Sequence, residues 1–141
     1  MPFGASIVAT KTGETLLRAL NAVAREYDPS AHAEVRALRM ATKRRKNLSL
    51  AGYTLYTTCE PCPMCMSMAL WAGIDRVVYG ATIEDATRHF DQIHIAAEEV
   101  ARRSDMRCKV VGPVLRDECY ELFAHPAFRK PAAKRTRRSN A

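Results

Sequence analysis

No apolar run in this sequence approaches the roughly 20 residues that a membrane-spanning helix needs. The N-terminus also lacks the charged-then-apolar pattern of a secretory signal. We therefore expect a cytoplasmic protein that has no membrane partner. What is present, 141 residues of which 48% are hydrophobic, is typical of one globular domain with a buried core.

Acidic residues are absent after Glu121, whereas six lysines and arginines fall between Arg129 and Arg138. This stretch accounts for most of the net charge of +7, so the body before it is nearly neutral. A basic tail can bind RNA, but such a composition is more often a disordered, solvated segment. We expect a domain over residues 1–125 and a basic, disordered tail over residues 126–141. RNA remains an alternative partner that is not favoured.

Disulfides are not expected, because the cysteine count of five is odd and three cysteines crowd into Cys59, Cys62 and Cys65. Cys62 and Cys65 lie three residues apart at the start of a predicted helix. Pro61 and Pro63 stiffen the entry to that helix, so both sulfur atoms can face one metal ion. This pattern indicates metal binding in a reducing compartment.

His32 is the candidate third ligand, and two thiolates with one imidazole leave a fourth tetrahedral position of Zn²⁺ open for water. Glu34 lies two residues from His32, where it can transfer protons without ligating the metal. A closed structural site that uses Cys59 as the fourth ligand is the alternative. That alternative leaves Glu34 without a task, so we expect a catalytic zinc site.

Strand and helix patterns alternate along the chain. Runs rich in β-branched, aromatic or alternating apolar residues predict strands at residues 3–10, 14–20, 53–58, 75–79 and 107–111. Caps and helical periodicity predict helices that begin at Asp28-Pro29, occupy 62–72, cover much of 84–103 and occupy 117–124. The order predicts an α/β fold with three layers, α/β/α, and a mixed five-stranded sheet with helices on both faces.

Three segments resemble the cytidine and deoxycytidylate deaminase superfamily, namely DPSAHAEVRALRMA, LYTTCEPCPMCMSMALWA and DRVVYGA. A His-x-Glu followed by Pro-Cys-x-x-Cys is the signature of zinc deaminases. The Cys-Glu-Pro-Cys-Pro-Met-Cys form, which begins at Cys59, and the later Phe90-Asp91 are similar to the guanine-deaminase-like branch. Gln92 departs from that branch, whose members often have a second acid at this place.

The resemblance implies a cytidine-deaminase-like fold and zinc-dependent hydrolytic deamination of a small nucleobase or nucleoside, with a guanine-like purine favoured. Glu34 would be the catalytic residue, and the zinc ligands would be His32, Cys62 and Cys65. The substrate would contact Asn21, Asp91 and the backbone around Ala33 and Glu60. The family is commonly dimeric, so the resemblance also implies a homodimer.

Three other functions remain open at this point. One is a tRNA adenosine deaminase that converts adenosine to inosine. The basic tail and the Lys43–Lys46 run favour this function. Another is a cytosine or cytidine deaminase. The last is a zinc-binding module without catalytic activity, against which the intact Glu34 argues.

Overall fold

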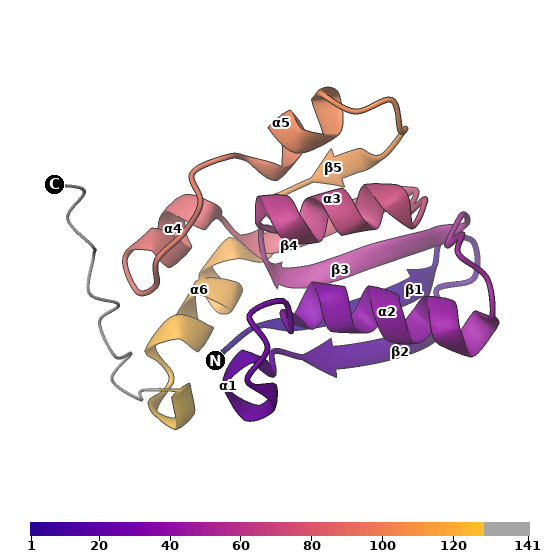
Figure 1. Cartoon of the computed structure of the whole chain (residues 1–141). Helices are drawn as coiled ribbons and strands as arrows, with labels where there is room; N and C mark the ends of the chain where they lie inside the picture. Colours follow the sequence, from indigo (N-terminus) through magenta and orange to yellow (C-terminus); the bar gives the residue numbers. More distant parts are fainter. Residues whose placement is uncertain (129–141) are drawn as a thin grey trace, which may run out of the picture.

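The computed structural model describes residues 1–128, and its centre is a five-stranded sheet in the order β2-β1-β3-β4-β5 (Figure 1). β1 (Gly4–Ala9) lies antiparallel between β2 (Thr15–Leu20) and β3 (Tyr53–Cys59). β4 (Arg76–Ala81) runs parallel to β3, and β5 (Lys109–Val111) runs parallel to β4. The sheet is therefore mixed, as the sequence predicts.

Two long helices, α2 (Ala33–Arg45) and α3 (Pro63–Trp71), cover one face of the sheet (Figure 1). The main core lies between them and the sheet, and Leu38, Leu55 and Val77 are all fully buried in it. α6 (Arg116–Ala124) packs on the opposite face at β4. There a Cβ atom on Gly80 would lie 2.2 Å from Cys119 Sγ, so the close approach of α6 requires glycine. The three-layer α/β/α architecture is confirmed.

The predicted start of the helix that carries Glu34 is wrong. The Asp28 carboxylate accepts hydrogen bonds from the backbone N–H and the hydroxyl of Ser30, which makes a local turn. α2 begins only at Ala33, and His32 occupies its N-cap position with an extended backbone. A short helix that the sequence did not suggest, α1 (Val23–Glu26), precedes this turn.

The single helix predicted over much of residues 84–103 is also wrong. The structure has two short helices, α4 (Ile83–Thr87) and α5 (Ala97–Arg102), joined by irregular residues 88–96. Phe90 and Ala97 have the seven-residue spacing of one helix face, but they pack in different places. Ala97 belongs to the main core, whereas Phe90 packs against a second, smaller cluster around Phe123.

The remaining predicted elements are present with small shifts at their ends. The described part of the chain ends with a 3-10 turn, Pro126–Phe128. The rest of the predicted tail lies outside the described residues, and the boundary at residue 125 stays a prediction. Within residues 1–128, no helix has the length and apolar character needed to cross a membrane.

Candidate metal and active site

Three ligating side chains come together where α2 and α3 begin. His32 is the N-cap residue of α2, Cys62 is the N-cap residue of α3, and Cys65 lies in the first turn of α3. His32 Nδ1 lies 3.7 Å from Cys62 Sγ and 3.5 Å from Cys65 Sγ, and the two sulfur atoms are 3.6 Å apart. The three ligand atoms predicted from the sequence thus form a triangle that can serve as one face of a coordination tetrahedron.

Local sequence explains why the two sulfur atoms converge. Cys62 has an extended backbone and directly precedes Pro63, which occupies the first position of α3, where proline is favoured. The Cys62 carbonyl accepts the backbone N–H of Met66, so the chain enters the helix at once. Residues three apart in a helix lie on the same face, which brings Cys62 and Cys65 together.

The spacing of these atoms fits zinc. Zn–S bonds of about 2.3 Å and Zn–N bonds of about 2.0 Å require tetrahedral edges of about 3.5–3.8 Å, and the three distances fall within or close to that range. Two thiolates and an imidazole are also donors that zinc prefers. A search of residues 1–128 for three or more His, Cys, Asp or Glu side chains close enough to hold a metal ion finds these three residues.

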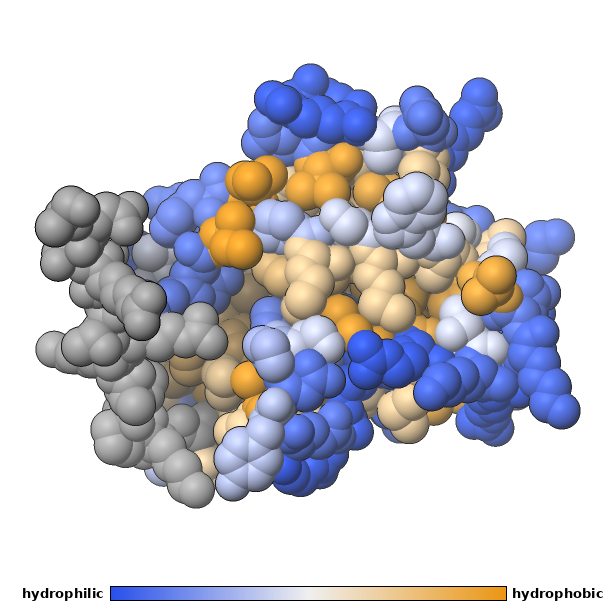
Figure 2. Space-filling view, viewed as in Figure 1, coloured by the Kyte–Doolittle hydropathy of each residue, from blue (hydrophilic) through white to orange (hydrophobic). Residues whose placement is uncertain are grey.

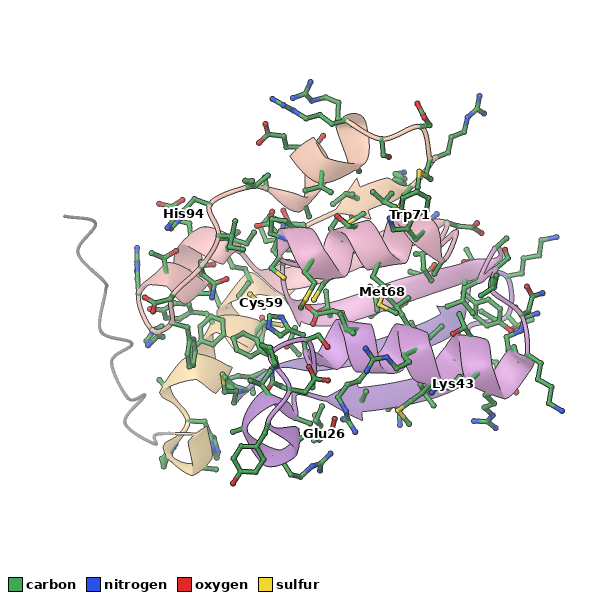
Figure 3. All side chains as sticks on the ribbon, in the orientation of Figure 1. Glu26, Lys43, Cys59, Met68, Trp71 and His94 are labelled. Atoms are coloured by element: carbon green, nitrogen blue, oxygen red, sulfur yellow. The ribbon has the colours of Figure 1, made fainter. Side chains whose placement is uncertain are left out.

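Cys59 is not part of this group, which argues against the closed four-ligand site. Its Sγ atom lies 3.9 Å from the Thr82 carbonyl oxygen, toward β4 and α4. Figure 3 shows Cys59 inside the molecule, near the left ends of α2 and α3.

The electrostatics of the ligand group suit a cation. The hydrogen bond between Cys65 and Cys62 lowers the pKa of Cys62 to about 4, which favours its thiolate form at neutral pH. The hydrogen bond with Cys62 in turn raises the pKa of His32. These shifts favour a Cys62 thiolate beside a His32 imidazolium, and a metal cation would take the place of the imidazole proton.

Glu34 lies beside this group as a buried carboxylate that is only 5% exposed. Its Oε2 atom is 3.6 Å from Cys65 Sγ, and its Oε1 atom is 3.1 Å from the Thr57 hydroxyl oxygen. Burial raises the pKa of Glu34, which makes its protonated form more accessible than that of an exposed carboxyl group. A carboxyl group with this property can both accept and return a proton.

Thr57 is a residue of this site that sequence reasoning missed. Its hydroxyl lies within hydrogen-bond distance of both Glu34 Oε1, at 3.1 Å, and the Cys59 carbonyl oxygen, at 2.9 Å. The hydroxyl can donate to an ionised Glu34, or accept from a protonated Glu34 while it donates to Cys59. The signal in the sequence was its position in the strand, because Leu55, Thr57 and Cys59 are two residues apart and therefore share the buried face.

A cavity of about 640 Å³ opens onto His32, Glu34 and Cys62. Its apolar wall includes Phe3, Val23, Phe90 and Ile93, and its polar groups include Asn21, Asp91 and Gln92. This volume is in the range of small-molecule sites, and an apolar slot with a few polar groups is suited to a flat, polar-edged ring.

Three of the four predicted substrate residues line this cavity. Asn21 does so with its Oδ1 atom bonded to the Val23 N–H at 3.2 Å, which orients its amide group. Asp91 and Glu60 also line it, although the Glu60 carboxylate binds backbone N–H groups of this chain. The contact predicted for Ala33 is through its backbone and stays a prediction, and the Ala33 side chain is fully buried in the main core.

Comparison with known proteins places this site in a family. Residues 1–81 match the family model described as the cytidine and deoxycytidylate deaminase zinc-binding region. The chain is 44% identical over 98 residues to guanine deaminase of Bacillus subtilis, an alignment that covers 69% of this chain and 62% of the relative. It is 32% identical over 124 residues to a tRNA-specific adenosine deaminase of Buchnera aphidicola, covering 88% of this chain and 74% of the relative.

The fold also matches solved structures. Guanine deaminase from Nitrosomonas europaea superposes with a TM-score of 0.80 and 25% sequence identity, over 87% of this chain and 71% of that one. The mixed five-stranded sheet flanked by helices is therefore shared with proteins of this group.

Proposed function

The chain belongs to the cytidine and deoxycytidylate deaminase family, and we propose that it hydrolyses the exocyclic amino group of a nucleobase or nucleoside, with a guanine-like purine favoured. The observation that carries this proposal is the position of Glu34. Its buried carboxylate lies next to a three-ligand zinc group at the bottom of a cavity sized for a small ring.

Zinc held by His32, Cys62 and Cys65 would supply the attacking hydroxide by lowering the pKa of water. Glu34 then performs the proton transfers. Its carboxylate takes one proton of the attacking water and delivers it to a ring nitrogen. It then takes the proton of the hydroxyl group added to the ring carbon and passes it to the exocyclic nitrogen. The carbon–nitrogen bond breaks, the nitrogen leaves as ammonia, and the oxygen of water remains on the ring as a carbonyl.

Asn21 and the segment around Phe90 would orient the ring. The Asn21 amide can donate to an acceptor on the base, since its oxygen already accepts from Val23. Phe90 offers an aromatic surface to the base, and Asp91 can accept from the N–H groups that a purine such as guanine presents. The similarity to a guanine deaminase supports the same preference.

The test is a measurement of ammonia release from guanine, cytosine, adenine and their nucleosides by the purified, zinc-loaded chain. We expect the highest kcat/KM for guanine. Preference for cytosine or a nucleoside would replace the favoured base but keep the reaction, whereas no ammonia from any of them, with zinc bound, would favour a non-catalytic module.

Editing of tRNA is the second candidate, and the similarity to a tRNA-specific adenosine deaminase favours it. The charges on α2 give it less support, because Arg36 and Arg44 donate hydrogen bonds to the carbonyl oxygens of Leu20 and Leu16 on the edge strand β2. Deleting residues 129–141 should leave turnover of guanine unchanged. Inosine formation in a tRNA anticodon stem-loop without activity on free bases would establish editing instead.

We also propose a homodimer. Figure 2 shows an apolar surface over α3 and its junction with the segment that leads to α5. Large side chains remain exposed there, with Trp71 at 79%, Ile93 at 57% and Ile95 at 41%, and Trp71 lies at the outer end of α3 in Figure 3. A second copy would cover this surface.

A cytoplasmic location is proposed from the cysteines rather than from the fold. All five are free thiols, and two of them are in the ligand group. Free thiols of this kind persist in a reducing compartment.

A further inference from the structure

One wall of the cavity is the irregular segment 88–96, and four consecutive residues of it, from Phe90 to Ile93, line the cavity. Its middle has few connections to the rest of the fold. Within residues 1–128, the hydrogen bonds of residues 91–95 stay inside the segment, from Gln92 Nε2 to the Asp91 carbonyl and from the Ile95 N–H to the Ile93 carbonyl. The position of this wall therefore depends on how its ends are held.

Glu60 holds both of the helices that flank the segment. Its Oε2 atom accepts the backbone N–H of Ile83, the first residue of α4, at 3.0 Å. Its Oε1 atom accepts the backbone N–H of Ala97, the first residue of α5, also at 3.0 Å. The N–H groups at a helix start have no partner within the helix, and one carboxylate satisfies one from each helix.

The Glu60 side chain is placed to act as a fixed point. It is only 8% exposed, and its own backbone N–H donates to the Ala81 carbonyl at 2.7 Å, which joins the end of β3 to the end of β4. Glu60 also stands between Cys59 and Cys62 in the chain. The metal-binding turn and the cavity wall are therefore both positioned from the same short stretch.

We propose that Glu60 is a positioning residue, which fixes the wall formed by residues 88–96 relative to the zinc ligands and thereby determines how tightly the base is bound. This inference rests on the proposed deaminase function. The N-terminal end of the wall keeps other attachments. The Phe90 ring packs edge-on against Phe3, with the ring centroids 5.3 Å apart, and also against Phe123, and His89 Nε2 lies 3.1 Å from the Tyr120 hydroxyl. Loss of the Glu60 contacts should therefore loosen the wall without unfolding the domain.

The test is the Glu60→Gln variant, compared with Asp85→Asn as a matched control. Glutamine has the shape of glutamate, but its amide nitrogen cannot accept a hydrogen bond, so the N–H of Ile83 or Ala97 loses its partner. Asp85 is another buried acid that accepts the Thr82 N–H at the start of α4, and within residues 1–128 its side chain is hydrogen-bonded to Thr82 and Arg116 rather than to α5. Both variants weaken the fold, but only Glu60→Gln disturbs the carboxylate that binds both flanking helices.

For Glu60→Gln we expect zinc content near that of the unmodified chain and faster amide hydrogen exchange over residues 88–97. We expect the KM for guanine to rise about 10- to 100-fold, which is the scale of effect that a misplaced site residue produces. The increase in KM should exceed the decrease in kcat. Asp85→Asn should leave the KM within about twofold. Unchanged exchange and KM in Glu60→Gln would overturn the proposal, as would an equal KM increase in Asp85→Asn.

Hydrogen exchange separates this inference from the proposed function. If the chain deaminates none of the bases, faster exchange over residues 88–97 in Glu60→Gln still supports the positioning role, and unchanged exchange contradicts it.

A second variant is available if Glu60→Gln does not fold. Ala97→Pro removes the backbone N–H that donates to Glu60 and leaves Glu60 itself unchanged. Proline is favoured at a first helical position, and Ala96 already has the ψ of 145° that a following proline requires. The same exchange and KM changes are expected, and their absence counts against the proposal.

Discussion

The Thr57 hydroxyl oxygen lies 3.1 Å from Glu34 Oε1 and 2.9 Å from the Cys59 carbonyl oxygen. This one contact joins the candidate proton carrier on α2 to the strand that leads into the metal-binding turn. It gives Glu34 a neighbour that can donate to its ionised form and accept from its protonated form. The first two predictions concern this pair.

Glu34→Gln should keep both the fold and the zinc but reduce kcat by at least about 10²- to 10⁴-fold, because glutamine cannot carry a proton. Steady-state ammonia release with zinc quantified by elemental analysis checks this. Near-normal turnover in a zinc-loaded variant would remove Glu34 from the mechanism.

Thr57→Val should shift the acidic limb of the pH–rate profile to higher pH. The hydrogen bond from Thr57 lowers the pKa of Glu34, so its loss raises that pKa further, and ionised Glu34 then appears only at higher pH. We expect kcat at neutral pH to fall roughly tenfold. Thr57→Ser keeps the hydroxyl and should keep the profile, and identical profiles for all three proteins would contradict this role.

Replacing both Cys62 and Cys65 by alanine should abolish zinc binding, whereas Cys59→Ala should retain about one zinc per chain. The reason is that Cys59 lies outside the ligand group, toward Thr82. Zinc content after dialysis distinguishes the variants. Loss of zinc in Cys59→Ala, or full zinc in the double variant, would refute the assignment.

Asp85→Asn should lower stability at neutral pH and weaken the dependence of stability on acid. Two hydrogen bonds from Arg116, at 2.8 and 2.7 Å, hold the pKa of Asp85 below its usual 3.8. Its contribution is therefore present above about pH 4 and is lost as pH falls through the depressed value. We expect a loss of about 1.5–3 kcal/mol in the free energy of unfolding at pH 7, measured by urea titration.

The neighbouring, exposed Glu84→Gln serves as the control for this loss. It should change stability by less than about 0.5 kcal/mol, as is typical of surface substitutions. Equal effects of the two variants at pH 7 would mean that the Arg116 pair contributes nothing.

Light scattering should show a dimer at micromolar concentration, and Trp71→Glu should convert it to a monomer, because a charge would be buried in the apolar interface. Tyr27→Glu is the matched control, since Tyr27 is 95% exposed at the C-cap of α1, away from that surface. A monomeric unmodified chain, or a dimer that tolerates Trp71→Glu, would contradict the proposed interface.

The sequence by itself determined the ligand types and the sheet. Imidazole and thiol groups can ligate zinc in any fold, so the sequence alone identified His32, Cys62 and Cys65 as candidates. Pro63 and the three-residue spacing determine the local turn that holds the two thiolates. The strands and α3 were also predictable, since alternating or β-branched runs and a glycine stop are signals within a few neighbouring residues.

Tertiary structure alone decided the parts that depend on distant contacts. Periodicity favoured one helix over residues 84–103, but Glu60 binds the N–H groups of Ile83 and Ala97 at two separate helix starts. Thr57 gained its role only because β3 faces α2, which brings its hydroxyl to Glu34 across 23 residues of chain. Such contacts join segments far apart in sequence, and no local pattern of residue types encodes which buried polar group will meet which partner.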